Sequence, residues 1–397
     1  MRHAGSFVLT MLIAALPLYA CAGSVETETN GTTPPDAGTT AQPPTAADVR
    51  TNVRDGFVAE AEWMRSYGVA TLARAPEAPA AFDRLNASEA QIVAAISPVA
   101  GDARAAQLAD LLHARANAFA DLVRTIGAKA APVGSDPQAA LDANAQQIAD
   151  FFVALCPNAF PSDAVNDLTS ANRSMAEALQ ARAADDRWAS ISSFDAAQAS
   201  SAHFADEVGF AIASTFGATL APSTTSRTED AVSLQLHVLF GDQVFWTRAY
   251  VADRMRNVEA QPELDRAVQA TIDMTGVLSP YFGQDAVQMQ AYIHADTTNA
   301  IAFVLALESG NQDTVQAISA QWNAGADTLA QYLAATARVD QAEAQRLLRV
   351  SVDREQAMIE ARANEQWDAE AANYQLVLES RTELASLLAS STVVTTH

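Results

Sequence analysis

The sequence has little positive charge. It carries 24 lysine and arginine residues against 47 aspartate and glutamate residues, which gives a net charge of −23, and Lys129 is its one lysine. This negative charge repels phosphate backbones, so nucleic acid is a poor partner. It also repels an anionic membrane surface, so charge alone would not hold the protein on a membrane.

Glycine, proline and aromatic residues are also scarce in this chain of 397 residues. It contains 16 glycines and 15 prolines, and aromatic residues make up 7% of it. The hydrophobic share of 49% is nevertheless large enough for real cores, and alanine, the best helix former, supplies much of it. No alternating pattern of useful length indicates a strand, so we expect an all-α protein.

The usual signatures of enzymes are missing from the sequence. It contains no Gly-x-Ser-x-Gly element, no phosphate-binding loop and no dinucleotide fingerprint. Acidic residues are too numerous to single out a catalytic pair. We therefore expect a protein without enzymatic activity and without a cofactor.

Cysteine is limited to Cys21 and Cys156, and the first of these lies in the most informative segment of the chain. A basic start and a short apolar run, Phe7 to Leu16, precede Leu18-Tyr19-Ala20-Cys21, which is typical of a secretory signal peptide. The segment resembles the lipobox of bacterial lipoproteins, in which the cysteine receives a lipid, with Tyr19 bulkier than usual. An ordinary secretion signal with an incidental cysteine is the alternative.

The lipobox resemblance implies residues 1–20 as a cleaved signal peptide and lipid attachment at Cys21. It places the protein in the cell envelope, and Ala22 after the cysteine favours the outer membrane, facing the periplasm or the cell surface. The membrane is then a partner through the lipid. Cys156 would be the one remaining thiol, with neither a disulfide partner nor a cysteine-based metal site, and we expect it to be buried and inert.

Residues 21–46 differ in composition from the rest of the chain. Threonine, proline, glycine and alanine dominate, and large apolar residues are nearly absent. Such a segment cannot bury enough surface to offset the entropy of ordering it. We expect a flexible linker between the lipid and the folded body.

The remaining sequence contains an internal repeat. The matching blocks are Glu62-Trp63-Met64-Arg65 with Phe245-Trp246-Thr247-Arg248, Ile96–Gly101 with Leu278–Gly283, Leu111-Leu112-His113 with Tyr292-Ile293-His294, Ala145–Phe152 with Ala326–Leu333, and Trp188 with Trp367. The offset changes only from 183 to 179, so the blocks keep one register. This predicts a tandem duplication with halves at residues 47–217 and 227–395.

Each half shows the apolar periodicity of helices. Leucine, valine, isoleucine and phenylalanine recur every three or four residues between 108 and 126, and again near the C-terminus. Asp136-Pro137 is typical of a helix start, and Ser226 with Glu229 forms a capping-box pattern. We expect two tandem, homologous up-and-down bundles, each of four long helices and one short helix, with the Ser-Pro-x-x-Gly elements as turns.

His113 and His294 are candidate ligand-binding residues because they match between the repeats. Each would lie at the edge of the apolar face of a long helix, where it could bind a ligand or act as an acid or base. A half-buried structural histidine is the alternative. Neither has glutamate three residues earlier, as a carboxylate-bridged metal bundle requires, so we expect no metal.

Arg65 and Arg248 are the other candidate ligand-binding residues. Each follows a tryptophan by two positions, so a tryptophan in the core would place its arginine towards a boundary. The arginines could capture an anion, or each could simply pair with an acidic side chain.

The second repeat also resembles a family of small bacterial helical proteins that are about one repeat long. The shared features are Trp246-Thr247-Arg248, the turn Pro280-Tyr281-Phe282-Gly283, His294, Trp322-Asn323-Ala324 and Trp367-Asp368. No activity is established for this family, so the resemblance implies a fold and not a function. The chain looks like a doubled, lipid-tethered version of it across most of residues 50–395.

The chain departs from the family where two further histidines are expected. Gln243 and Glu60 occupy the position three residues before the tryptophan, and Ser351 and Asn172 occupy the later one. These losses remove a three-histidine site. We expect an envelope protein that binds a small molecule or a protein partner between helices, near His113 and His294; the alternative is a metal-binding or enzymatic bundle that uses these histidines.

Overall fold

The computed structural model describes residues 43–128, 136–223 and 225–395. The signal peptide, Cys21, most of the linker and Lys129 lie outside this part of the chain. Within it, all regular structure is α-helical apart from an isolated bridge between Thr45 and Ala221. The prediction of an all-α protein is confirmed.

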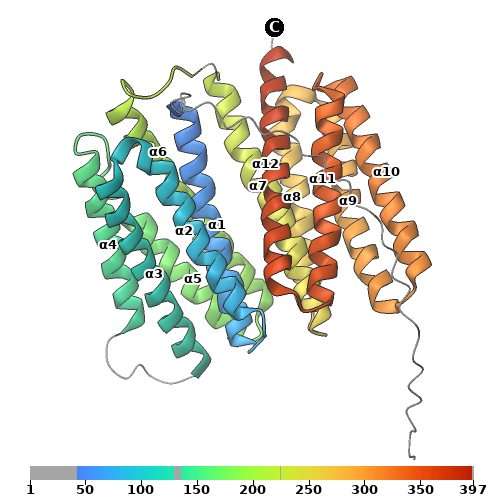
Figure 1. Ribbon diagram of the computed structural model, residues 1–397, viewed down its shortest axis with the longest axis horizontal. Coiled ribbons are helices and arrows are strands. Elements are labelled where there is room, and N and C mark those ends of the chain that lie inside the picture. Colours follow the sequence, from blue (N-terminus) through green and yellow to red (C-terminus); the bar gives the residue numbers. More distant parts are fainter. Residues whose placement is uncertain (1–42, 129–135, 224, 396–397) are drawn as a thin grey trace, which may run out of the picture. The chain divides into compact units, whose positions relative to one another are not determined.

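Six helices make up the first half (Figure 1). They are α1 (Ala46–Leu72), α2 (Ala78–Ala100), α3 (Asp102–Ala128), α4 (Pro137–Leu155), α5 (Val165–Ala183) and α6 (Arg187–Phe216). Six more follow in the second half. They are α7 (Arg227–Met255), α8 (Gln261–Phe282), α9 (Gln284–Ser309), α10 (Gln312–Thr336), α11 (Gln341–Ala363) and α12 (Trp367–Thr395).

The expectation of five helices per half was wrong. A single glycine, Gly101 or Gly283, separates two helices in each half, at the end of the Ser-Pro-x-x-Gly element that predicted a turn there. Both glycines have a positive φ, of 77° and 55°, which a residue with a side chain adopts only with strain. Pro98 and Pro280 lie inside the last turns of α2 and α8 and not in turns between helices.

The helices of the two halves run in the same order, and we call residues at matching helix positions counterparts. Residues with a positive φ follow the ends of counterpart helices. Arg74 and Asn257 follow α1 and α7, and Asp185 and Glu365 follow α5 and α11. Arg187, and not Trp188, is the counterpart of Trp367, because each begins its helix. This order is what a duplication would produce, and the duplication itself stays a prediction.

Helix starts follow the local sequence signals. The predicted capping box at Ser226 and Glu229 opens α7, and Thr45 with Asp48 forms a second capping box at the start of α1. Asp136 caps α4, with Pro137 as its first residue, as predicted. Each cap satisfies backbone N–H groups that a helix start leaves without partners.

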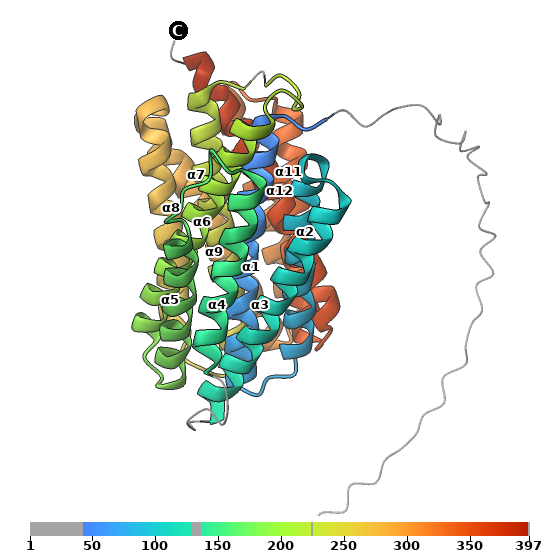
Figure 2. The same cartoon turned by 90° about the vertical axis from the view of Figure 1, so that its left-hand side faces the viewer.

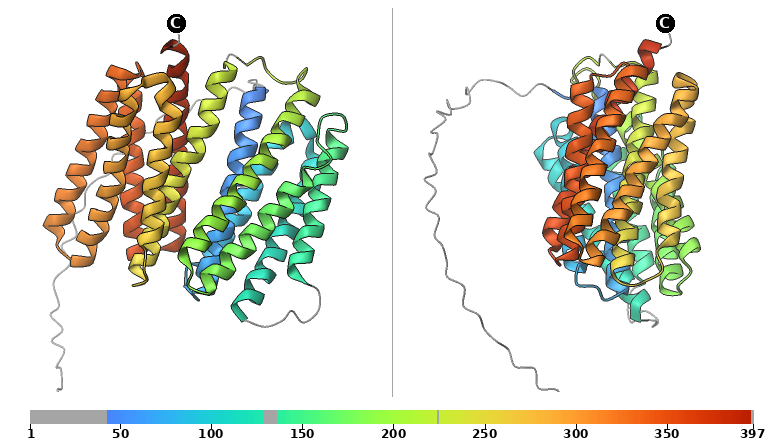
Figure 3. Two further views of the ribbon diagram at one scale, coloured as in Figure 1. Left: turned by 180° about the vertical axis from the view of Figure 1, so that it is seen from behind. Right: turned by 90° about the vertical axis from the view of Figure 1, so that its right-hand side faces the viewer.

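The two halves pack against each other through three main pairs of helices. The helix α1 contacts its counterpart α7, and the contact of α2 with α12 matches that of α8 with α6. Figures 1 and 3 show the first half, blue to green, beside the second half, yellow to red. Figure 2 looks onto the first half, whose helices run lengthwise side by side. The larger of two hydrophobic clusters draws residues from both halves, so the boundary between them is part of the core.

The described helices include none that is both long and apolar enough to span a membrane. Cys156 is fully buried and has no disulfide partner among the described residues, and burial raises the pKa of its thiol. The expectation of a buried thiol is confirmed.

Candidate functional site

The two Trp-x-Arg elements meet where α1 packs against α7. Trp63 and Trp246 are buried, with 2% and 0% of their surfaces exposed. Arg65 and Arg248 were expected at the edge of the core, but both are buried because the contact of α1 with α7 covers this edge. Only 3% of Arg65 and 7% of Arg248 is exposed.

Each arginine stacks on the tryptophan of the other half. The guanidinium carbon of Arg65 lies 4.4 Å from the ring centroid of Trp246, and that of Arg248 lies 4.7 Å from the centroid of Trp63. Such a contact between a desolvated cation and an aromatic ring stabilises by about 2 kcal/mol. The exchange explains why both elements carry tryptophan and arginine two residues apart.

Arg248 has a full carboxylate partner in Glu370 of α12. Its Nε donates to Glu370 Oε1 at 2.7 Å and its Nη2 to Oε2 at 3.0 Å, while Arg362 Nη2 donates to Oε1 at 3.1 Å. Burial alone would raise the pKa of the Glu370 carboxyl, but Arg248 and Arg362 lower it to about 2. Arg248 and Glu370 therefore form a complete ion pair, in which both carboxylate oxygens accept hydrogen bonds.

Arg65 has no such partner. Its Nε and Nη2 are buried without a hydrogen-bond partner among the described residues, and the closest carboxylate oxygen, Glu263 Oε1, is 3.9 Å from Nη2. The counterpart of Glu370 is Ser190, the fourth residue of α6, which is buried with an unpartnered hydroxyl. Burial, and then the neighbouring Arg182, lower the pKa of Arg65 to about 10.

The surrounding side chains form a dense charge cluster. Arg182 Nη1 donates to Glu263 at 2.8 Å and its Nη2 to Asp253 at 2.6 Å, and Arg187 pairs with both acids. Arg362 Nη1 donates to Glu77 at 3.0 Å. The guanidinium groups of this arginine cluster are those of Arg65, Arg182, Arg187, Arg248, Arg256 and Arg362, and its carboxylates are those of Glu77, Asp253, Glu263 and Glu370.

Positive charge is thus in excess at this place, because six guanidinium groups face four buried carboxylates and one exposed carboxylate, that of Asp185, which pairs with Arg187 at 3.3 Å. Burial and the neighbouring Asp253 raise the pKa of Glu263, which increases the excess further when this carboxyl binds a proton. In a protein of net charge −23, an unbalanced buried cation costs free energy unless an anion joins it. The cluster can therefore bind an anionic group.

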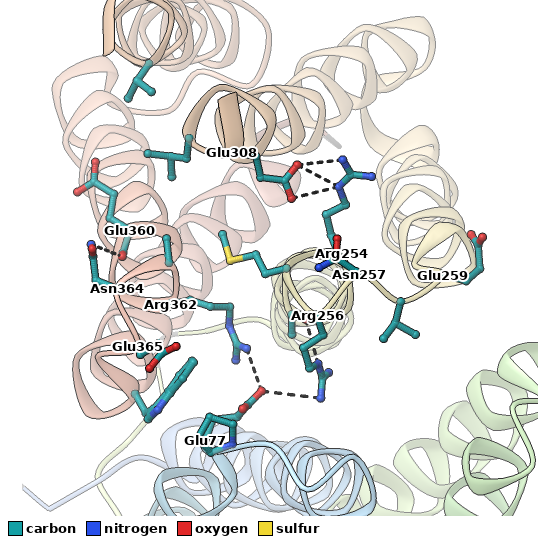
Figure 4. Close-up of a pocket in the computed structure, with 18 of the residues that line it drawn as sticks. Glu77, Arg254, Arg256, Asn257, Glu259, Glu308, Glu360, Arg362, Asn364 and Glu365 are labelled. Carbon is teal, nitrogen blue, oxygen red and sulfur yellow. Dashed lines mark hydrogen bonds and ion pairs between the residues drawn. The ribbon is translucent and has the colours of Figure 1, made fainter. Parts of the chain in front are cut away.

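Two adjoining hollows give access to the cluster. An inner cavity of about 40 Å³ lies against Arg65, Arg182 and Arg248. An outer pocket of about 1220 Å³ opens beside it (Figure 4). The two share the residues Glu77, Ala252, Arg256 and Arg362.

The wall between the hollows is held by ion pairs. Figure 4 shows Glu77 between Arg362 and Arg256, and farther out Arg254 with Glu308, whose closest atoms are 2.9 Å apart. Trp367 also lines the outer pocket, and Arg362 stacks on its ring at 5.5 Å. The inner cavity has room for one water or a small charged group, whereas the outer pocket has the volume of a small-molecule site.

The predicted histidines do not join this site. His113 is exposed on α3, and His294 is half-buried on α9, with its Nδ1 lacking a partner among the described residues. The helices α3 and α9 belong to different halves (Figure 1). Neither histidine lines the inner cavity or the outer pocket.

Residues at the positions of the missing family histidines lie inside the bundles. Arg115 of α3 donates to Glu60 at 2.6 Å and to Asn172 at 3.2 Å, so an internal ion pair occupies this place in the first half. In the second half, Gln243 donates to Asp296 at 3.3 Å. The local pattern around Arg115 did not signal this pairing, because its partners are 55 and 57 residues away.

One described group of side chains has the composition of a cation site. Asp167, His203 and Glu207 have ligand atoms within 4.8 Å of one another, and His203 is exposed. His203 Nδ1 is 2.9 Å from Asp167. Exposed acidic groups of this kind are common, and the cluster carries no further conclusion.

Sequence reasoning found Arg65 and Arg248 but missed the rest of the arginine cluster. Arg182 and Arg362 could have been noticed, because they are counterparts near the ends of α5 and α11. Most of their acidic partners could not, since Asp253, Glu263 and Glu77 are 71 to 285 residues away, and only Glu370 is near in sequence, 8 residues from Arg362. No family model, curated protein or solved structure matches this chain. The resemblances to the lipobox and to the helical family stay predictions.

Proposed function

We propose that this protein is a binding protein of the bacterial cell envelope that takes up an anionic small molecule at the arginine cluster without changing it chemically. One observation supports this above all: Arg65 is buried between the halves and lacks the carboxylate that its counterpart Arg248 has in Glu370. A ligand anion would supply it. His113 and His294 have no part in this proposal.

The two hollows indicate the general form of the ligand. The inner cavity, at about 40 Å³, admits only a small acidic group, and the outer pocket, at about 1220 Å³, has room for a larger body. A carboxylate or phosphate matches the planar fork of a guanidinium group. Trp367 and Met255 offer apolar contacts for the ligand body in the outer pocket.

Thermal unfolding in the presence of simple anions tests this proposal. A ligand that binds the native state alone raises the melting temperature with its concentration. Sodium phosphate and sodium benzoate should each raise it more than sodium chloride does at equal ionic strength. A phosphate response without a benzoate response would identify a phosphate-type ligand, and the reverse a carboxylate.

Two matched variants locate the binding site. Arg65→Met should abolish the anion-specific shift. Arg254→Met removes an equally large cation from the wall of the outer pocket and should leave most of the shift in place. If neither anion shifts the wild type, or if Arg65→Met responds like the wild type, the arginine cluster is not the anion site.

The envelope location is a separate part of the proposal, based on the lipobox resemblance at Cys21. Replacing Cys21 with Ser removes the sulfur that would carry the lipid, so the variant should leave the membrane fraction of cells. A variant that stays with the membranes would exclude this anchor.

A further inference from the structure

A second constellation lies on another face of the boundary between the halves. His237 of α7 contacts Ser386 of α12 through Nε2, at 2.9 Å from the serine Oγ. Its other ring nitrogen, Nδ1, is 3.0 Å from Oδ2 of Asp55 in α1. A hydroxyl, an imidazole and a carboxylate thus follow one another in the order and at the atoms that activate a serine nucleophile.

The side chain of Ser386 differs from the other serine and threonine side chains that are described in its helix. These donate to a carbonyl oxygen three residues earlier in α12, and they are Ser380, Thr382, Ser390, Ser391 and Thr392. Among the described residues, the hydroxyl of Ser386 has hydrogen-bond partners only in His237 and Ser233, at 2.9 and 3.4 Å. Its hydroxyl is therefore directed across the boundary and not back onto its own helix.

His237 and Ser386 differ in their exposure to solvent. His237 is 7% exposed, whereas Ser386 is exposed. The imidazole is shielded from water while the hydroxyl can be reached. A pocket of about 470 Å³, lined by Asp55, His237 and Thr382, lies beside them.

We propose that Ser386 is the nucleophile of an acyl-transfer site in which His237 is the general base and Asp55 is a positioning residue. The substrate class is a small carboxylic ester that is neutral or cationic. The carboxylates of Asp55 and Glu379 line the adjoining pocket, and its described lining includes neither arginine nor lysine, which disfavours an anionic ester.

The reaction follows from the contacts. With His237 Nδ1–H donating to Asp55, Nε2 accepts the hydroxyl proton of Ser386 as Oγ attacks the ester carbonyl carbon. The bond from that carbon to the alcohol oxygen breaks, and the alcohol leaves with the proton from His237. Water then attacks the acyl-serine, His237 takes its proton and returns it to Ser386, and a carboxylic acid leaves.

The hydroxyl of Ser233 lies 3.4 Å from Ser386 Oγ, where it can donate to the ester oxygen that gains negative charge during the attack. The counterparts of His237 and Ser386 in the first half are Arg54 and Asp206, which form an ion pair at 2.7 Å. The first half therefore has no equivalent nucleophile, and the site occurs once in the described chain.

Reaction of the purified full-length chain in detergent with p-nitrophenyl acetate tests this proposal. We expect release of p-nitrophenol and an acetyl group on Ser386, located by fragmenting the C-terminal tryptic peptide that begins at Thr382. Ser386→Ala should abolish the acetylation of this peptide. His237→Gln should slow the release by about 100-fold, the usual contribution of a general base.

Two further variants separate a catalytic role from a structural one. Ser390→Ala removes an exposed hydroxyl that bonds its own helix, and it should react like the wild type. Asp55→Asn should slow the reaction at every pH by at least about tenfold, with an unchanged circular dichroism spectrum. The proposal is wrong if Ser386→Ala releases p-nitrophenol as fast as the wild type does, or if the acetyl group is found on other residues only.

Discussion

Arg65 and Arg248 show how one partner changes the role of a side chain. Both are buried and both stack on a tryptophan of the other half. Arg248 belongs to a closed pair with Glu370, whereas the counterpart of that acid is Ser190. A paired buried charge stabilises its partner, and an unpaired one is available to a ligand.

The two arginines should therefore respond differently to the same substitution. Arg248→Met leaves Glu370 without its two shortest bonds and should lower the free energy of unfolding by about 3 kcal/mol. Arg65→Met leaves no carboxylate without a partner, since Glu263 keeps Arg182. The lost contact with Trp246 is offset by the removal of a buried charge that has no partner, so the net cost should be about 1 kcal/mol or less. Urea unfolding of both variants measures the difference; equal losses would mean that Arg65 is as firmly paired as Arg248.

Glu62 predicts a pH dependence. Burial raises the pKa of its carboxyl to about 8, although the hydroxyl of Tyr374 donates to it at 2.7 Å. Between about pH 4.5 and pH 8 the unfolded chain has lost this proton while the native state still holds it, so the free energy of unfolding falls as the pH rises through this range.

Glu62→Gln should remove this dependence, because the amide stays neutral. Relative to the wild type, the variant should gain at least about 1 kcal/mol in going from pH 5 to pH 8. Denaturant unfolding at the two pH values gives the comparison. A parallel loss of stability in both proteins over this range would show that Glu62 titrates normally.

Among the helices, those with a marked start were predicted well from the sequence. Ser226 with Glu229, and Asp136 with Pro137, satisfy the first N–H groups of a helix through neighbours in the chain. The break at Gly101 was predicted from its Ser-Pro-x-x-Gly element, but the turn is shorter than expected because Pro98 still belongs to α2. Local signals thus give the helix starts, but not every helix end.

The cap of α7 offers a simple check. Ser226→Ala removes the acceptor for the N–H of Glu229, which is 3.1 Å from the serine oxygen, and should cost about 1 kcal/mol. Ser192→Ala, at an exposed position inside α6, should be neutral or slightly stabilising. Melting temperatures of the two variants should separate; similar values would mean that the cap contributes little.

Across the described chain, the all-α class and the two Trp-x-Arg elements could be predicted because they depend on periodicity and repetition. The arginine cluster could not be predicted in full. Arg248 meets Glu370 across 122 residues, and Arg362 meets Glu77 across 285, distances at which no sequence pattern specifies a partner. The predicted role of the histidines had only their repetition to support it.

The shared core predicts that the halves depend on each other. Trp63, Trp246 and their arginines would become exposed if residues 43–223 and 225–397 were made separately. We expect each fragment alone to show a broad, low melting transition by circular dichroism, and a mixture of both to regain a sharp one. Fragments that each melt as sharply as the intact chain would show two independent domains.

A substitution that gives Arg65 a carboxylate partner within the chain tests whether Arg65 binds an anion in the wild type. Ser190→Glu places a carboxylate at the counterpart of Glu370, where it can pair with Arg65. Calorimetric melting in a buffer with and without phosphate or benzoate is the measurement. If Arg65 awaits an anion, the variant melts at a higher temperature than the wild type without added anion, and neither anion raises it further. A variant that melts lower than the wild type, and still responds to anions as the wild type does, would contradict anion binding at Arg65.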